Sequence, residues 1–435
     1  MHDVKQGLEK GPDASKLQPS GWVAAAGLVE RWLARAERVD TLLEGLATNL
    51  NGQERARAQQ LFYGVVRWAS RLEAGLAGLM TRPPRTKVKA VLMIAGFELL
   101  EGGPDLTAKV IHHAVERAKT VCSAKEAGLV NAVARKLAAR LAEKPADLAT
   151  EFAHPEWLVA RWNRQFGPET TRQLLEWNQQ PAPVYARWRI EAPVPAFLAP
   201  TKWANFYEVK AGHWDDIRRL ATEGALYLQD PSTRLCLELL APQAGEVILD
   251  ACAAPGGKSL FIADTMNTGK VVALDEPAAP GKTDIRLVRL KENLARAPAG
   301  VEVAMIEADL TAVNTVFYRN LNLPESYDAV LLDAPCSNTG VMRHRIDVKW
   351  RLQDGDFARH AQQQLALLHA AARLVRSGGR LVYSTCSIDG DENESVVKAF
   401  FDSRAGGPYK LERSVQAYPW KDGHDGAGAF LLRKA

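Results

Sequence analysis

Cysteine is scarce in this chain: five cysteines occur among 435 residues, and no two of them form a C-x-x-C pair. An odd number of widely separated cysteines argues against a disulfide framework, and the lack of close pairs argues against a zinc knuckle. We therefore expect neither disulfides nor a bound metal. Each cysteine is then present either for packing or for the reactivity of its thiol.

Long apolar runs are also missing, because no stretch approaches the roughly 18 residues that a membrane-spanning helix needs. The first twenty residues are polar and lack the apolar core of a secretion signal. We therefore expect no membrane association and a cytoplasmic location. Composition leaves the oligomeric state open.

Charge of one sign is not in large excess, since 55 basic residues face 51 acidic ones. The basic residues are concentrated in one place: residues 109–144 carry eight basic and three acidic side chains. Two interpretations stay open, a solvated helix face or a surface that contacts the phosphates of a nucleic acid.

Apolar periodicity divides the chain into three parts. Up to about residue 145 the apolar residues follow helical spacing, as over 88–100 and again from 107, with a break at Gly102-Gly103-Pro104. Residues 144–223 are irregular and contain eight prolines and six tryptophans. We expect a helical domain over 20–145, a connector and small α/β module over 150–223, and an α/β domain over 224–435.

The tryptophans of the connector lie among arginines, of which Arg187 and Arg189 are two. Such a mixture fits stacking on unpaired bases or, more commonly, an ordinary aromatic core.

Short apolar runs of strand length alternate with helical stretches after Gly224. Continuous apolar strands of this kind predict a parallel sheet covered by helices on both faces, a doubly wound α/β fold. The expected strands contain 247–249, 271–274, 301–306, 329–332 and 381–383. Because ligands bind at the carboxyl ends of such strands, the residues that follow each run are the candidate site.

The first strand leads into a loop of small residues, Asp250-Ala-Cys-Ala-Ala-Pro-Gly-Gly-Lys-Ser259, and then into a helix. Paired glycines permit close approach of a ligand, and a helix N-terminus favours negative charge. The loop is not a triphosphate-binding P-loop, because Cys252 stands where that motif has its first glycine. The pattern G-x-G-x-x-G is absent as well, which argues against a nicotinamide cofactor.

The next two strands end in carboxylates. Asp275 follows the second strand, where an acidic side chain suits the paired hydroxyls of a ribose. Asp309 follows the third strand and suits the amino group of an adenine. Together these features predict an adenosine ligand without a triphosphate.

The last two expected strands end close to cysteines, Cys336 after Asp333 and Cys386 after Thr385. Adjacent strand ends bring such residues to one edge of the sheet, so we expect the two thiols to converge, with their pKa lowered by Lys258 and by helix N-termini. An adenosine cofactor and a nucleophilic thiol suggest methyl transfer to a poorly nucleophilic carbon such as pyrimidine C5. That reaction needs a nucleophile, a base and an acid, roles open to Cys336, Cys386, Asp333 and Lys258.

At this point the residues resemble a known family, the RNA cytosine-C5 methyltransferases of the NOL1/NOP2/Sun type. The catalytic resemblance rests on residues 250–259, 333–340 and 384–394, and residues 226–232 and 154–158 resemble the preceding segments. Residues 57–66, 96–100 and 128–133 resemble a NusB-type RNA-binding domain. This pairing is similar to the RsmB/Sun type, whose members methylate 16S rRNA.

The resemblance implies roles for individual residues. Cys386 matches the nucleophile, and Cys336 matches the second cysteine, which helps to release the product. Lys258 and Asp333 match residues close to the target base. S-adenosyl-L-methionine is the implied cofactor, with contacts at Cys252, Ala253, Ala254, Pro255, Gly256, Gly257, Lys258, Asp275, Asp309 and Asp333.

The chain departs from the family pattern at three places. The segment 276–282 is longer and richer in proline, the usual Arg-His-Pro-Asp order is replaced at 343–347, and Arg189 stands for an asparagine.

The resulting hypothesis is a Rossmann-like enzyme that methylates a cytosine in small-subunit rRNA, with no DNA partner. Two alternatives remain: the same chemistry on tRNA, or a non-catalytic RNA-binding or antitermination factor.

Overall fold

The structure is a computed structural model that describes residues 20–35, 37–46, 49–313 and 315–435. The expectation drawn from the polar N-terminus therefore lies outside the described residues, apart from Ser20. The chain divides into two compact units, one that ends at Leu175 and one that begins at Glu176. The three domains predicted over 20–145, 150–223 and 224–435 are not tested by this division into two units and stay a prediction.

The first unit is helical throughout its described part, as predicted. Its apolar core includes Phe62, Val65, Ile94 and Leu137, none of them exposed to solvent. The helices are α1 (Gly21–Ala34), α2 (Val39–Glu44), α3 (Gly52–Arg67), α4 (Ala69–Leu76), α5 (Thr86–Val121), α6 (Ala124–Ala142), α7 (Leu148–Glu151), α8 (Glu156–Phe166) and α9 (Pro168–Gln179), the last of which crosses into the second unit.

The break predicted at Gly102-Gly103-Pro104 is confirmed, because two helices meet here at a kink within the span of α5. Gly103 has a φ of 64° and leaves the helical region, and Pro104 follows it directly. Glycine adopts this left-handed conformation without the strain that a side chain would cause. Proline also removes one backbone donor, so a second helix leaves this kink in a new direction.

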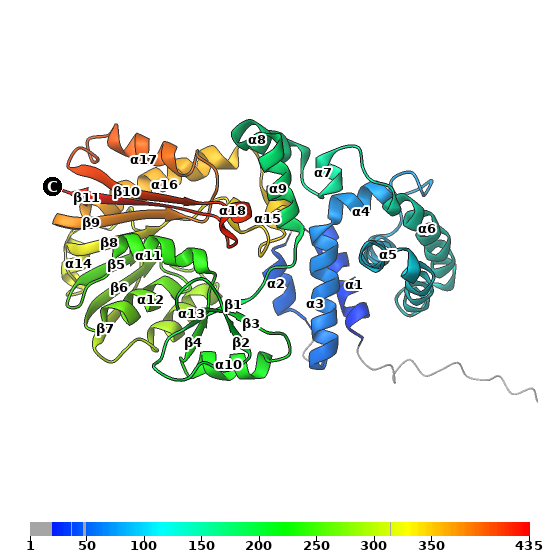
Figure 1. The fold of residues 1–435 in the computed structure, drawn as a ribbon, viewed down its shortest axis with the longest axis horizontal. Helices are drawn as coiled ribbons and strands as arrows, with labels where there is room; N and C mark the ends of the chain where they lie inside the picture. Colours follow the sequence, from blue (N-terminus) through cyan, green and yellow to red (C-terminus); the bar gives the residue numbers. More distant parts are fainter. Residues whose placement is uncertain (1–19, 36, 47–48, 314) are drawn as a thin grey trace, which may run out of the picture. The chain divides into compact units, whose positions relative to one another are not determined.

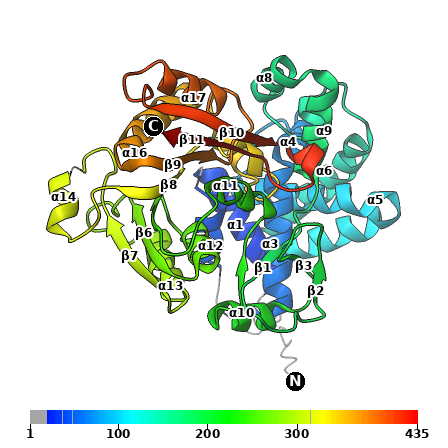
Figure 2. The same ribbon diagram turned by 60° about the vertical axis from the view of Figure 1, so that its left-hand side comes forward.

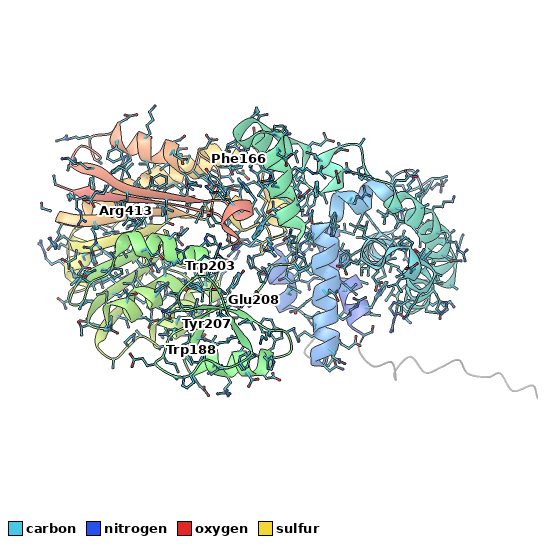
Figure 3. All side chains as sticks on the ribbon, in the orientation of Figure 1. Phe166, Trp188, Trp203, Tyr207, Glu208 and Arg413 are labelled. Atoms are coloured by element: carbon cyan, nitrogen blue, oxygen red, sulfur yellow. The ribbon has the colours of Figure 1, made fainter. Side chains whose placement is uncertain are left out.

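The second unit begins with a small antiparallel sheet in the order β2-β3-β1-β4. Its strands are β1 (Tyr185–Trp188), β2 (Leu198–Pro200), β3 (Phe206–Val209) and β4 (Leu226–Leu228), and α10 (Trp214–Thr222) packs on one face. The last strand lies just past residue 223, where we placed the end of the connector module. Trp188 and Tyr207 belong to this sheet and flank its apolar core (Figure 3).

The large sheet has seven strands in the order β10-β11-β9-β8-β5-β6-β7. The five predicted strands are present and parallel: β5 (Val247–Ala251), β6 (Gly269–Asp275), β7 (Val301–Glu307), β8 (Tyr327–Asp333) and β9 (Val375–Thr385). Beside these parallel strands, β10 (Tyr409–Ala417) and β11 (Ala427–Lys434) add an antiparallel edge that we did not predict.

Helices cover both faces of the large sheet, as Figures 1 and 2 show. Ile248 and Val271 point to one face, which packs against α11 (Arg234–Leu240) and α12 (Gly257–Met266); α13 (Ile285–Leu294) covers Ala273 on the same side. Leu249 and Val272 point to the opposite face. That face is covered by α14 (Thr315–Asn320), α16 (Asp356–Arg373) and α17 (Glu394–Phe401).

Short helical turns complete the second unit: Pro231–Thr233, Thr339–Val341, α15 (Val348–Arg351) and α18 (Pro419–Asp422). None of the described helices is both long enough and apolar enough to cross a membrane. The loops after β5, β6, β7, β8 and β9 leave the same edge of the sheet, since these strands run parallel.

Candidate functional site at the carboxyl ends of the strands

The loop after β5 connects the sheet to the N-terminus of α12. Cys252 has a φ of 65° and turns the chain out of the strand. The N–H of Ala253 donates to the carbonyl of Leu274 at 3.0 Å, and that of Ala254 donates to Asp275 Oδ2 at 2.8 Å. The carbonyl of Pro255 accepts from Asn293 Nδ2 at 2.7 Å. These contacts hold the loop against β6 and α13.

The two glycines of this loop are required by packing. Gly256 has a φ of 99°, and a Cβ on it would lie 2.9 Å from Leu290 Cδ1. A Cβ on Gly257 would lie 2.7 Å from the ring of Tyr227. The predicted role of these glycines was close approach of a ligand, but within the protein they already permit close approach of α13 and the Tyr227 ring.

The two acidic strand ends differ in their environment. Asp275 is buried, and its Oδ1 also accepts the N–H of Glu276 at 2.9 Å. Asp309 is exposed, and its Oδ1 accepts the N–H and the hydroxyl of Thr311 at 2.8 and 2.7 Å. Each carboxylate retains further acceptor capacity, which suits hydroxyl or amino groups of a ligand.

Lys258 and Asp333 form an ion pair, with Nζ and Oδ2 2.7 Å apart. Burial alone would lower the pKa of the Lys258 ammonium, but the Asp333 carboxylate outweighs this effect and raises that pKa. The structure thus brings together the first turn of α12 and the end of β8, two predicted parts of the site.

A second carboxyl group, Asp250, lies below this pair and was not predicted as a site residue. It is not exposed to solvent, and burial raises its pKa to about 7. Its Oδ2 accepts the hydroxyl of Ser259 at 2.5 Å, whereas its buried Oδ1 has no partner among the described residues. The signal was present in the sequence, because Asp250 ends an apolar strand.

The two predicted cysteines converge. Cys336 Sγ and Cys386 Sγ lie 3.2 Å apart, and Cys386 also donates to Asn338 Oδ1 at 3.3 Å. The prediction of a lowered thiol pKa is wrong for Cys336, because its hydrogen bond to Cys386 and its burial raise that pKa well above the usual value.

The other three cysteines are placed differently. Burial raises the pKa of Cys236, a core residue of α11, to about 12. Burial likewise raises the pKa of Cys252, in the loop after β5. Cys122 was a candidate for the core but is only half-buried at the end of α5.

A close crossing of three backbone segments supports the cysteines. The N–H of Gly340 donates to the carbonyl of Cys386 at 3.0 Å, and the N–H of Gly426 donates to the carbonyl of Gly340 at 2.8 Å. A Cβ on Gly340 would lie 2.5 Å from the Gly426 oxygen and 2.7 Å from the Cys386 oxygen. Only glycine therefore permits this approach without movement of the backbone.

Buried polar side chains join the two cysteine loops, and no role was predicted for them. Thr339 donates to Asp389 Oδ2 at 2.7 Å, and Thr385 donates to Asn393 Oδ1 at 2.7 Å. The carboxylate of Glu392 accepts the N–H of Ser337 at 2.8 Å. The sequence signal was the cluster of acidic and amide residues that follows Cys386.

The replaced segment 343–347 contributes an ion pair. His344 Nδ1 lies 3.0 Å from Asp425 Oδ1, and its Nε2 lies 3.2 Å from the Pro183 carbonyl. Burial alone would lower the pKa of His344, but the bond to Asp425 and the charge of Asp230 raise it to about 9. A cluster is formed by one ring nitrogen of His344 and one carboxylate oxygen each of Asp230 and Asp425, all within 4.8 Å of one another. The positive charge of an imidazolium between two carboxylates accounts for this cluster.

The substituted Arg189 is structural. Arg189 and Arg187 both bind Asp264 of α12, at 2.8 and 2.7 Å, and both guanidinium groups are almost fully buried. Arg187 also lies over the ring of Phe261, with its central carbon 4.2 Å from the ring centre. These two arginines attach the small sheet to α12 and are therefore not available to RNA bases.

The basic stretch of the first unit is only partly neutralised. Lys119 pairs with Glu116 at 2.6 Å, and Lys144 pairs with Glu151 at 3.1 Å. Lys109, Lys125 and Lys136 are exposed and form no ion pair with described residues. Free surface ammonium groups are compatible with phosphate contacts.

Comparison with known sequences assigns both parts of the chain. The family described as 16S rRNA methyltransferase RsmB/F matches residues 237–417, and the NusB family matches residues 14–139. Ribosomal RNA small subunit methyltransferase B of Yersinia enterocolitica is 31% identical over 399 residues, 86% of this chain and 88% of that one. The protein of the same name in Vibrio cholerae is 31% identical over 433 residues, 94% of this chain and 96% of that one.

Solved structures support the fold. The crystal structure of PH0851 has a TM-score of 0.75 at 21% identity and covers 96% of this chain and 100% of its own. A methyltransferase homologue from Pyrococcus horikoshii has a TM-score of 0.53 at 22% identity, covering 66% of this chain and 98% of its own.

The methyl donor of this class, S-adenosylmethionine, fits the strand ends. The Asp275 carboxylate suits its ribose, and the free N–H groups at the start of α12 suit its carboxylate. The unpartnered Oδ1 of Asp250 adds a buried acceptor beside the same loop. From sequence and fold together, the chain belongs to the RsmB/F family of S-adenosylmethionine-dependent 16S rRNA methyltransferases.

Proposed function

We propose that this protein methylates C5 of a cytosine in small-subunit rRNA through a covalent bond between Cys386 and C6 of that base. The observation that carries the proposal is the pair of thiols 3.2 Å apart at the ends of β8 and β9. A methyltransferase that acts on nitrogen or oxygen has no need of two adjacent thiols. Pyrimidine C5 does need one, because it becomes nucleophilic only after a thiolate has added to C6.

The two thiols take different parts. Cys386 attacks C6, and the electron pair of the C5–C6 double bond moves to C5. When bound, S-adenosylmethionine supplies a methyl group on a cationic sulfur, an electrophile that C5 can attack. Cys336 then assists removal of the C5 proton by a base, and the electron pair of the broken C5–H bond restores the C5–C6 double bond and expels Cys386 as a thiolate. Half-buried Cys386 is the more accessible of the two thiols, which supports its role as nucleophile.

Lys258 and Asp333 lie where they can contact both the cofactor and the base. Their ion pair keeps Lys258 protonated, so that it is a donor to the target base and a cation near the Cys386 thiolate. Cys252 to Gly257, Asp275 and Asp309 are the proposed remaining cofactor contacts. The target base must be unstacked to reach thiols at a strand end.

Two variants test the mechanism with unmodified small-subunit rRNA and a radiolabelled methyl donor. Cys386→Ala should abolish methyl transfer while S-adenosylmethionine binding stays normal. Cys336→Ala should accumulate an adduct of protein and RNA that survives denaturation in SDS. Methyl transfer by the Cys386→Ala protein would overturn the assignment of the nucleophile, and absence of an adduct would overturn the release role of Cys336.

The choice of RNA is proposed from the relatives and is tested separately. Both curated relatives are described as ribosomal RNA small subunit methyltransferases, and a NusB-like domain with exposed lysines suits an RNA partner. Mapping 5-methylcytosine in rRNA and tRNA of a deletion strain distinguishes the two substrates. A site lost from tRNA alone would favour the alternative, and loss from neither RNA would favour a non-catalytic role.

A further inference from the structure

Ser337, the residue that follows Cys336, is hydrogen-bonded to the buried carboxylate of Glu392. Glu392 lies in the loop between β9 and α17 and is not exposed to solvent. It accepts the N–H of Ser337 at 2.8 Å and also the hydroxyl of Ser337. A single carboxylate thus holds both the backbone and the side chain of the residue next to Cys336.

Glu392 is held in turn by two further side chains. Gln364 of α16 donates through Nε2 to Glu392 Oε1 at 3.0 Å and to the carbonyl of Pro335 at 2.9 Å. The hydroxyl of Tyr383 donates to the backbone carbonyl of Glu392 at 2.6 Å. Cys336 therefore lies between two residues, Pro335 and Ser337, that are both tied to this one cluster.

Electrostatics makes this arrangement unusual for a purely structural role. No cation pairs with Glu392 among the described residues, so three uncharged donor groups compensate its burial. Burying a carboxylate costs several kcal/mol unless its oxygens are hydrogen-bonded, and an apolar side chain would fill the space more cheaply. The advantage of a carboxylate here is geometric. It accepts both the N–H and the hydroxyl of Ser337, which fixes the position of the residue next to Cys336.

We propose that Glu392 is a positioning residue of the methyl-transfer reaction, which holds Cys336 beside Cys386 for the release of the product. This inference rests on the proposed function, in which Cys336 assists release. Cys386 reaches its place by other contacts, through Asn338 and the backbone of Gly340. Loss of the Glu392 anchor should therefore affect release of the base more than attack on it.

The test is a single-turnover experiment with unmodified small-subunit rRNA and a labelled methyl donor. In Glu392→Gln only one of the two side-chain atoms remains an acceptor and the negative charge is lost, so the hold on Ser337 is weakened. We expect attack and the first methyl transfer to stay within about threefold of the wild type. Release should slow at least tenfold, and the SDS-stable adduct should accumulate as in Cys336→Ala.

A matched control and a milder variant complete the design. Asp402→Asn makes the same chemical change at an exposed residue beyond the other end of α17 and should leave both rates unchanged. Ser337→Ala removes the hydroxyl contacts to Glu392, Thr339 and Ser387, keeps the N–H contact to Glu392, and should slow release about threefold. If Glu392→Gln does not fold, Ser337→Ala decides: slowed release supports the proposal, and wild-type release overturns it.

The outcomes separate this inference from the proposed function. Wild-type protein that forms no 5-methylcytosine would overturn the proposed function, and the role of Glu392 with it. Normal release by a folded, active Glu392→Gln protein would overturn the role of Glu392 alone. Equal loss of attack and release, with unchanged cofactor binding, would also overturn it, because that result indicates general disorder of the site.

Discussion

Many individual residues around Cys336 and Cys386 act by fixing the positions of their neighbours. Gly340 lets two backbone segments meet behind Cys386, and Glu392 fastens the residue beside Cys336. Lys258 and Asp333 fix each other's charge across two elements. The thiols, Lys258 and Asp333 were predicted as site residues, whereas Glu392 was not, because its partner Ser337 lies 55 residues away in the sequence.

His344 provides a pH-dependent prediction at this scale. Its pKa of about 9 in the folded protein exceeds the roughly 6.5 of an unfolded histidine, so its contribution to stability is complete below about pH 6.5 and is lost as pH rises through 9. In His344→Gln, which does not titrate, the free energy of unfolding should fall less between pH 7 and 9.5 than in the wild type. Urea denaturation across this range measures the difference, and identical slopes for both proteins would contradict the prediction.

At the scale of elements, strands were predicted where they are continuously apolar. The runs that formed β5, β6 and β8 are buried on both faces and carry an unbroken apolar signal. The edge strand β10, Tyr-Lys-Leu-Glu-Arg-Ser-Val-Gln-Ala, is mostly exposed and lacks that signal. Its partner β11 joins the sheet by pairing with β9 on its other side, and periodicity within either segment does not predict that distant pairing.

The attachment of β1 to α12 gives a prediction for elements. Asp264→Ala should lower the free energy of unfolding by about 3–5 kcal/mol, because it leaves two almost fully buried arginines, Arg187 and Arg189, without their carboxylate. Chemical denaturation followed by tryptophan fluorescence measures this loss. Asp215→Ala removes the partner of an exposed arginine and should leave the midpoint unchanged. A small effect of Asp264→Ala would show that the pair is dispensable for this packing.

The whole molecule consists of two compact units with separate cores, and the predicted cofactor residues all lie in the second. A ligand that binds only one unit stabilises the folded state of that unit through mass action. Cofactor binding is therefore expected to be visible in the unfolding of residues 176–435 alone.

S-adenosylmethionine at 100 times its Kd should raise the free energy of unfolding of the second unit by about 2.7 kcal/mol. Differential scanning calorimetry should show this as an upward shift of one transition while that of the first unit stays in place. Asp275→Ala should abolish the shift. ATP is the matched ligand control, because the loop after β5 lacks the first glycine of a triphosphate-binding motif. An equal shift with ATP would contradict the adenosine-without-triphosphate interpretation.

The helical first part, the five parallel strands and the residues that end them were predictable, because they depend on periodicity and on the direction of neighbouring strands. The meeting of Cys336 and Cys386 was predictable for the same reason. The folded protein alone revealed the antiparallel edge, the structural use of Arg187 and Arg189, and the raised pKa of Cys336. Those features arise from burial and from contacts between distant segments, which no local pattern encodes.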